Sequence, residues 1–242
     1  GHRSVIEAGA GEQSHFSDHD CADAAGDLVF SKEQVYQADV ILKVAPPTLE
    51  EINLMHPNQI LISPLQLPLI DADYINQLKR KRVIALAMEY IMDGAGNFPV
   101  VRIMSEMAGL SAVLTAGELL TLDRGGNGVL LGGISGVPSA KVVILGAGIV
   151  AENASRVALG LGAEVRVFDN NIAKLKRLKD KVQQQIYTSV LNPVYLEREL
   201  ETADVVIGAI HSKSGRTPVI VSEDMVSRMK AGAVIIDISI DQ

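Results

Sequence analysis

A glycine-rich turn in the second half of the chain constrains the fold most. The turn, Gly146-Ala147-Gly148, directly follows the apolar run 141–145 and directly precedes the segment 150–161, which has helical spacing. A strand, a glycine turn and a helix in this order begin a βαβ unit that binds dinucleotides. Gly146 permits the sharp turn, and Gly148 leaves room for a pyrophosphate beside the free amide groups of the helix. Ala151 occupies the third small position, where helix and strand pack closely.

An acidic residue completes this pattern. Asp169 ends the next apolar run, 165–168, and lies 23 residues after Gly146. A carboxylate at this spacing accepts hydrogen bonds from the ribose hydroxyls and repels a 2′-phosphate, which predicts NAD rather than NADP. The simpler alternative is a structural turn with a surface aspartate, but it does not explain why strand, glycines, helix and acid occur in this order.

The predicted NAD site includes the glycine turn, the start of its helix and the ends of neighbouring strands. A basic run at 174–181 follows Asp169, and one of its residues, Lys174, could approach the adenosine ribose. A solvated helix face is the simpler explanation of that run as a whole. The predicted cofactor-binding residues from this pattern are Gly146, Gly148, Ile149, Val150, Asp169, Lys174, Ala209, Ile210 and Ile238.

Short apolar segments alternate with helical ones throughout the second half, which indicates a parallel sheet of the doubly wound α/β class. The first hundred residues mix strand-like and helical segments, among them 5–8, 40–44, 60–63 and 83–88 as strands. The last of these is apolar without alternation, like a strand buried on both faces. We expect two domains, 1–99 and 100–242, joined in a long apolar helix near residue 100.

Composition narrows the class of protein. The formal net charge is −7 and aromatic residues make up 4%, so a nucleic-acid surface or a polybasic membrane anchor is not expected. The single cysteine, Cys21, excludes an intramolecular disulfide and favours the cytoplasm. No transmembrane segment is expected, because the most apolar stretches, 129–151 and 231–240, are interrupted by proline or charge. The first residues do not read as a signal peptide and resemble the middle of a protein.

Longer blocks of the sequence resemble the alanine dehydrogenase and pyridine nucleotide transhydrogenase family. The matching blocks are 104–109, 128–138, 160–163, 203–209 and 229–242, with Gly1-His2, 7–11 and 42–44 in the first half. The likeness is closer to alanine dehydrogenase, because the Arg-Ala-Gln-containing loop of the transhydrogenase subunit is not found. The resemblance implies two Rossmann-like domains with a cleft between them, of which the second binds NAD and the first is incomplete in this chain. It also implies a homo-hexamer.

The activity implied by the resemblance is the reversible oxidation of L-alanine, with NAD and water, to pyruvate, ammonia and NADH. The resemblance places Ser105 at the cofactor and Asp241 beside the nicotinamide and substrate. The catalytic lysine and histidine of the family correspond to Ala45 and Gln66. Alanine cannot transfer a proton or polarise a carbonyl, and glutamine can only donate a hydrogen bond.

Other residues could take over these roles. His211 follows the apolar run 205–210, whose carboxyl end faces the cofactor crevice in this class of sheet, although loop histidines are commonly just solvated. Lys43 is a second candidate, with a structural role as its alternative. The predicted catalytic residues are therefore Asp241, His211, Gln66 and Lys43.

No metal site is predicted. The group His15, Asp18, His19 and Asp20 has superficial metal-ligand spacing, but a helix start capped by Ser17 or Asp18 explains it. Glu89 and Glu106 are likewise read as solvated carboxylates rather than a catalytic pair.

Three functions remain open on the sequence. The first is an NAD-dependent amino-acid dehydrogenase of the alanine dehydrogenase type, which we favour. The second is a transhydrogenase-type NAD(H)-binding component, which needs no acid–base lysine or histidine. The third is a non-catalytic NAD-binding module.

Overall fold

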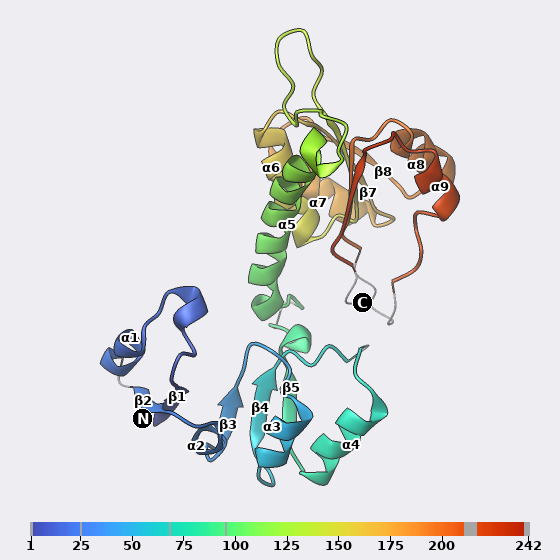
Figure 1. Cartoon of the computed structure of the whole chain (residues 1–242). Helices are drawn as coiled ribbons and strands as arrows, with labels where there is room; N and C mark the ends of the chain where they lie inside the picture. The colour runs from blue at the N-terminus through green and yellow to red at the C-terminus, as the bar shows by residue number, and fades with distance from the viewer. Residues whose placement is uncertain (1, 25, 68, 95, 211–216, 240–242) are drawn as a thin grey trace. The chain divides into compact units, whose positions relative to one another are not determined.

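The structure is a computed structural model that describes residues 2–24, 26–67, 69–94, 96–210 and 217–239. The chain divides into two compact units, Gly1–Val100 and Val101–Gln242. Both are α/β units with parallel sheets, as the sequence predicts. Figure 1 labels their elements.

The second unit contains a five-stranded parallel sheet in the order β10-β9-β6-β7-β8. Its strands are β6 (Lys141–Leu145), β7 (Glu164–Phe168), β8 (Tyr187–Ser189), β9 (Val205–Gly208) and β10 (Val234–Asp237). The chain runs outward from β6 to one edge and then crosses to the other side of β6. This reversal next to β6 is the switch point at which such sheets bind ligands.

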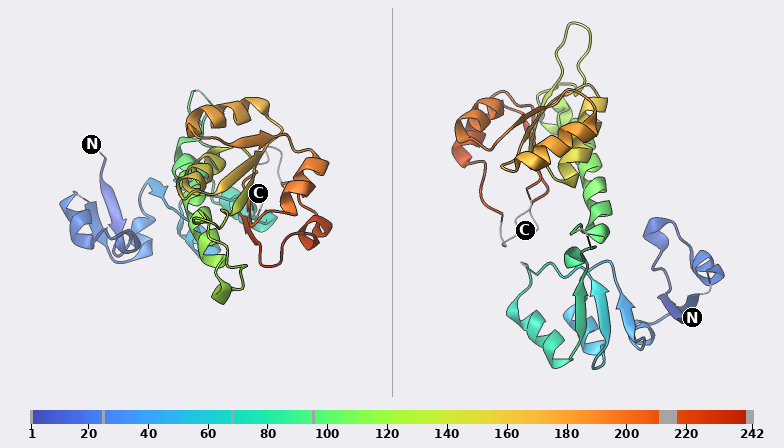
Figure 2. Two further views of the ribbon diagram at one scale, coloured as in Figure 1. Left: turned by 90° about the horizontal axis from the view of Figure 1, so that it is seen from above. Right: turned by 180° about the vertical axis from the view of Figure 1, so that it is seen from behind.

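Helices cover both faces of this sheet (Figures 1 and 2). They are α5 (Pro99–Leu119), α6 (Ile149–Gly160), α7 (Ile172–Val182), α8 (Pro193–Leu200) and α9 (Glu223–Ser227). One apolar core joins α5, α6 and α7 to side chains such as Val142 and Ile144 of β6. A second core joins α8 and the α9 region to Val143 and Leu145, the alternate residues of the same strand. The central strands are thus buried on both faces, as their continuous apolar runs require.

Helix α5 passes a length and composition test for crossing a membrane, with 22% of its most apolar stretch buried. It is not one of the stretches that the sequence singled out. Core helices of water-soluble proteins pass the same test, and Ala112, Val113 and Ala116 of α5 are buried in the first core of the second unit. This packing favours a helix that belongs to the fold of that unit.

The first unit contains two small parallel sheets, β1-β2 and β3-β4-β5. The strands are β1 (Ser4–Glu7), β2 (Gly26–Val29), β3 (Val40–Leu42), β4 (Ile60–Ser63) and β5 (Ile84–Ala87). The helices are α1 (Asp18–Asp23), α2 (Lys32–Val35), α3 (Leu49–Leu54) and α4 (Ala72–Arg80). Short 3-10 turns in the chain span Glu12–Ser14, Met88–Tyr90 and Leu122–Arg124.

The prediction that strand 83–88 is buried on both faces is wrong for this chain. On one face of β3-β4-β5, Ile41 and Leu61 pack in a core with the residues of α3 and α4. On the other face, Leu42 is 73% exposed, and Ile84 and Leu86 of β5 are exposed as well. No described helix covers that face, which explains why an apolar strand here is only half buried.

Helix starts in the first unit follow the local sequence closely. Ser17 and Asp20 form a capping box at α1, and Thr48 and Glu51 form another at α3. The spacing of Thr48 and Glu51 predicts the second box, because a hydroxyl followed three residues later by a carboxylate satisfies two free backbone amides. For α1 the sequence predicts a cap by Ser17 or Asp18 but not the return bond to Asp20. It misses the short elements β2, α2, β8 and α9, whose three to five residues are too few to show a period.

Candidate cofactor-binding site

The turn between β6 and α6 can be built only with glycine at its first position. Gly146 has φ +104°, a backbone conformation that residues other than glycine rarely adopt. A Cβ there would lie 2.4 Å from the carbonyl oxygen of Ala209. The amide of Gly146 donates to the Phe168 carbonyl oxygen at 2.7 Å, which ties the turn to the end of β7. The fold itself therefore explains this glycine.

Gly148 is different, because nothing in the described protein requires it. Its φ of −84° suits any residue, and a Cβ built on it meets no atom within 4 Å. The missing side chain leaves open space at the N-terminus of α6. A pyrophosphate needs such a space to approach the backbone.

The start of α6 also offers unpaired amides. Its N-cap is Gly148, and no side chain of the described residues caps it, whereas Asn171 caps α7 and Asn192 caps α8. Among the described residues, no acceptor pairs with the amides of Gly148, Ile149 and Val150. These groups, at the positive end of the helix dipole, are the donors that an anion uses.

Asp169 lies at this turn. Its Oδ2 accepts the Ala147 amide at 2.8 Å, and its Oδ1 accepts the Asn171 amide at 2.7 Å. The carboxylate is thus held next to the glycines by backbone groups. It retains lone pairs for further donors, as a ribose-binding carboxylate must.

The ends of β9 and β10 meet the same turn. Ala209 donates its amide to Leu145, and Ile238 donates its amide to Gly208, at 2.8 and 2.9 Å. The Ile210 amide donates to the Ser239 hydroxyl at 3.1 Å. The structure therefore brings the predicted residues Ala209, Ile210 and Ile238 to the carboxyl edge of the sheet that also carries the glycine turn.

A hollow of about 430 Å³ lies at this edge, lined in part by Gly208, Ile210, Asp237 and Ser239. The Thr217 hydroxyl is buried in its wall and has no hydrogen-bond partner among the described residues. A buried hydroxyl without a partner is costly and indicates a missing polar group. Sequence reasoning does not find Thr217, because nothing in its local pattern distinguishes it from a loop residue.

Two further predicted cofactor residues lie at the margin. Ser105 is on α5, one turn before Gly109, whose backbone approaches the Val150 carbonyl so closely that a Cβ would lie 2.4 Å from it. Lys174 is half-buried in the first turn of α7, and its amide donates to the Asn171 side chain. No described contact ties either side chain to the glycine turn, so both stay predictions.

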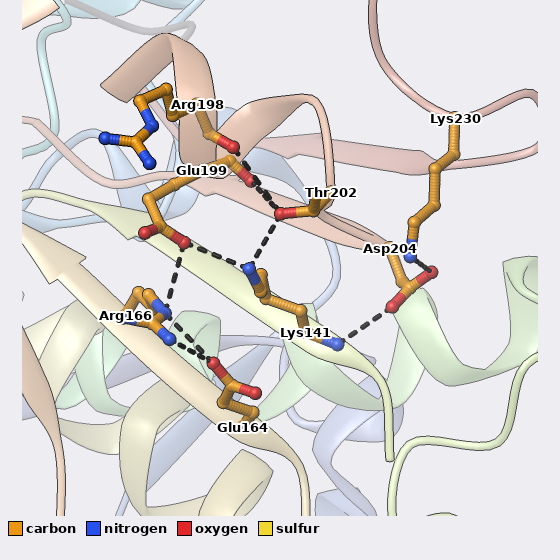
Figure 3. Close-up of polar contacts among 8 residues, drawn as sticks. All are labelled: Lys141, Glu164, Arg166, Arg198, Glu199, Thr202, Asp204 and Lys230. Carbon is orange, nitrogen blue, oxygen red and sulfur yellow. Dashed lines mark hydrogen bonds and ion pairs between the residues drawn. The ribbon is translucent and has the colours of Figure 1, made fainter. Parts of the chain in front are cut away.

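The opposite, amino-terminal edge of the sheet is closed by ion pairs (Figure 3). Lys141 contacts Glu199 at 3.0 Å, and Arg166 contacts Glu199 at 3.1 Å. Buried Asp204 accepts from the Lys141 amide at 2.9 Å and from the Lys230 ammonium at 2.8 Å. These charged side chains neutralise one another at the amino-terminal edge. The backbone amides at the start of α6, which have no acceptor among the described residues, lie at the opposite, carboxyl edge of the sheet.

Of the four candidate catalytic residues, the structure describes two, Lys43 and Gln66. His211 and Asp241 lie outside the described residues. The Lys43 ammonium lies 2.8 Å from Glu51, a buried carboxylate that Lys32 also contacts at 3.2 Å. Burial alone would raise the pKa of Glu51, but hydrogen bonds from Lys43, Thr48 and Lys32 lower the pKa to about 2. Lys43 is therefore engaged in holding α3.

Gln66 has an exposed side chain on a backbone with φ +51°. The Glu89 carboxylate accepts the Gln66 amide at 2.7 Å and the Leu65 amide at 3.0 Å. Glu89 thus positions the loop of residue 66, a role that spacing along the chain does not reveal. Ala45 is exposed and lies just before Pro46.

The histidine and aspartate group near residue 18 has a structural explanation. Ser17 caps α1, and the Asp18 carboxylate accepts the Gly9 amide at 2.8 Å. His19 pairs with Asp23 at 3.1 Å. Within the part of the chain that the structure describes, no group of three or more His, Cys, Asp or Glu side chains is arranged to hold a metal ion.

A parallel sheet with a glycine turn at its switch point, uncapped amides and an adjacent carboxylate defines the class of Rossmann-like dinucleotide-binding proteins. Comparison with known proteins narrows this class. The family description "Alanine dehydrogenase/PNT, N-terminal domain" matches residues 1–108, and "Alanine dehydrogenase/PNT, C-terminal domain" matches residues 112–242. The chain belongs to the alanine dehydrogenase and pyridine nucleotide transhydrogenase family. This membership confirms the predicted resemblance, and the family is NAD(H)-dependent, as the glycine motif predicts.

Two bacterial alanine dehydrogenases support the same family assignment. The chain is 37% identical over 242 residues to alanine dehydrogenase of Staphylococcus epidermidis and 36% identical to that of Bacillus subtilis, covering 100% of this chain in both cases. It spans 65% and 64% of the length of these relatives.

Two solved structures of similar fold support the same family assignment. An L-alanine dehydrogenase superposes with a TM-score of 0.93 at 34% identity, covering 100% of this chain and 67% of that one. A transhydrogenase from Sinorhizobium meliloti superposes with a TM-score of 0.83 at 26% identity, covering 99% and 70%.

Proposed function

We propose that the protein containing this chain is an NAD(H)-dependent oxidoreductase of the alanine dehydrogenase type. The reaction would interconvert L-alanine, NAD and water with pyruvate, ammonia and NADH. The observation that carries the proposal is Gly148, whose lack of a side chain is explained by neither its backbone conformation nor its packing. Family membership supplies the reaction class.

The second unit would hold the cofactor with its backbone. The amides of Gly148, Ile149 and Val150 would bind the pyrophosphate, and Asp169 would accept the ribose hydroxyls. The bound cofactor supplies the hydride acceptor or donor. The strand ends Ala209, Ile210 and Ile238 would flank it, and Ser105 and Lys174 are proposed as further contacts by resemblance and by sequence position respectively.

The acid–base groups are the open part of the reaction. The engagement of Lys43 with Glu51 argues against Lys43 as the base. Gln66 can donate a hydrogen bond to a substrate carbonyl, but it cannot exchange a proton near neutral pH. We therefore assign proton transfer to His211 and Asp241, and we expect the reaction to be slow.

A second candidate is a transhydrogenase-type component that binds NAD(H) and passes hydride to another nucleotide. Ala45 and Gln66 favour it, since direct hydride transfer between nicotinamides needs no acid–base residue. The likeness to a transhydrogenase structure is compatible with this role. A non-catalytic NAD-binding module is the limiting case in which no hydride is transferred.

NADH absorbance in the full-length protein distinguishes these functions. Oxidation that requires both pyruvate and ammonium supports the dehydrogenase. Oxidation only with an oxidised nicotinamide nucleotide as acceptor supports the transhydrogenase type, and binding without any oxidation supports the module. Hexameric assembly and a cytoplasmic location remain proposals drawn from family resemblance and composition.

A further inference from the structure

One basic side chain of α7 reaches the glycine turn. The Arg177 guanidinium donates through Nη2 to the carbonyl oxygen of Ala147 at 3.2 Å. The amide of this same residue donates to Asp169 at 2.8 Å. Ala147 is therefore held by an anion on one side and by a cation on the other. The basic run after Asp169 is thus more than a solvated helix face at this position.

Among the basic side chains of that run, Arg177 is the one with a described hydrogen bond to the glycine turn, and no described carboxylate neutralises its charge there. Lys181 lies on the same helix face and pairs with the buried Glu152 of α6 at 3.1 Å. No described carboxylate lies within ion-pair distance of Arg177, and its one described hydrogen bond, to a neutral carbonyl, uses one of its five donors. A guanidinium in this situation suits a phosphate, which it can bind through two parallel hydrogen bonds.

We propose that Arg177 is a specificity residue at the adenosine ribose and acts opposite to Asp169. This inference rests on the proposed function, because it takes Asp169 as the ribose-binding carboxylate. Asp169 accepts ribose hydroxyls and repels a 2′-phosphate, while Arg177 is held on the same turn and attracts that phosphate. The site is therefore an NAD site that needs the loss of only one charge to accept NADP(H).

The test uses NADH and NADPH, which differ only in the 2′-phosphate, titrated by nicotinamide fluorescence into the full-length protein. Asp169→Asn keeps an oxygen for the Ala147 amide while removing the charge. We expect this variant to bind NADPH at least about tenfold more tightly than the wild type does. Adding Arg177→Gln should remove most of that gain and change NADH affinity less than about threefold.

Lys176→Gln in the Asp169→Asn background is the matched control. It removes the same charge from the neighbouring residue, which faces another side of α7. NADPH affinity should then change less than about twofold, since no described contact ties the Lys176 side chain to the glycine turn, whereas Arg177 is bonded to Ala147. Arg177→Lys, which keeps charge without the planar fork, should bind NADPH with intermediate affinity and serves if Arg177→Gln does not fold.

Three results overturn the inference. Asp169→Asn fails to gain NADPH affinity, or Arg177→Gln weakens NADH and NADPH alike, or Lys176→Gln acts as strongly as Arg177→Gln. A folded wild-type protein that binds neither nucleotide overturns the proposed function and this inference with it. NADH binding without the predicted NADPH response overturns only the inference.

Discussion

The two units differ in how their candidate functional groups are built. In the second unit, the proposed NAD site consists largely of backbone groups, and its first glycine packs against the Ala209 carbonyl. In the first unit, the two positions to which the family resemblance assigns the catalytic lysine and histidine are Ala45 and Gln66, both exposed. A change at Gly146 would disturb the fold, whereas a change at Ala45 would not. A binding site made of backbone groups is thus tied to the fold, whereas exposed side chains can change without disturbing it.

The strongest way to break this comparison is to restore the two chemical groups. Ala45→Lys combined with Gln66→His should raise NADH oxidation by pyruvate and ammonium at least about a hundredfold, because general acid–base catalysis contributes that much. Histidine tolerates the left-handed backbone of residue 66, whose φ is +51°. Initial rates of NADH oxidation, followed by the absorbance of NADH, check the outcome.

Ala45→Met with Gln66→Asn is the control for the restored pair. It introduces a long side chain and a residue suited to φ > 0 without a group that titrates near neutral pH. Its rate should stay at the wild-type level. An equal rise in both double variants, or none in either, contradicts the view that these two positions limit the chemistry.

The cofactor side of the comparison is tested by Gly148→Val. Because a Cβ at 148 meets no atom within 4 Å, stability should change by less than about 1 kcal/mol, most of it from the poorer N-cap that valine makes. NADH affinity should fall at least about thirtyfold, which corresponds to ~2 kcal/mol. Fluorescence titration and thermal unfolding of the same samples measure both. A drop in stability with unchanged affinity would show that the glycine serves the fold.

A smaller effect concerns the Glu51 cluster of the first unit. Glu51→Gln leaves Lys43 and Lys32 without their common carboxylate and should lower the free energy of unfolding by about 1 to 3 kcal/mol. NADH affinity should not change, because these residues belong to the other unit. Chemical denaturation measures the effect, and Glu50→Gln, an exposed neighbour in the same helix, is its control. An unstable Glu50→Gln variant would argue against a specific role of the cluster.

The same carboxylate predicts a pH dependence. Its pKa falls from 4.5 to about 2 on folding, so the unfolded chain takes up the proton first as the pH drops. The stabilisation is fully present above pH 4.5 and is lost as the pH falls toward 2. The difference in unfolding free energy between wild type and Glu51→Gln should therefore shrink by about 1 to 2 kcal/mol between pH 6 and pH 3. A difference that stays constant over this range contradicts the assignment.

Local signals in the sequence predict much of this structure. The glycine turn, the strand–helix alternation and the helix caps at Ser17 and Thr48 are short-range patterns with a direct physical cause, and β4 and β6 have the predicted bounds. Contacts between distant residues are not accessible in this way. Glu89 holding the Gln66 loop, Lys43 paired with Glu51 and Arg177 on the Ala147 carbonyl each depend on how separate elements pack. The number of apolar residues in these strands likewise does not predict that one face of β3-β4-β5 is exposed.

The most direct measurement follows NADH in the full-length protein, with binding by fluorescence and oxidation by absorbance in the presence of pyruvate and ammonium. Our account predicts saturable NADH binding together with slow oxidation that needs both substrates, at least about a hundredfold below the Ala45→Lys and Gln66→His double variant. NADH binding without any oxidation would contradict the dehydrogenase assignment while leaving the cofactor site intact. A folded protein that does not bind NADH would contradict the site itself.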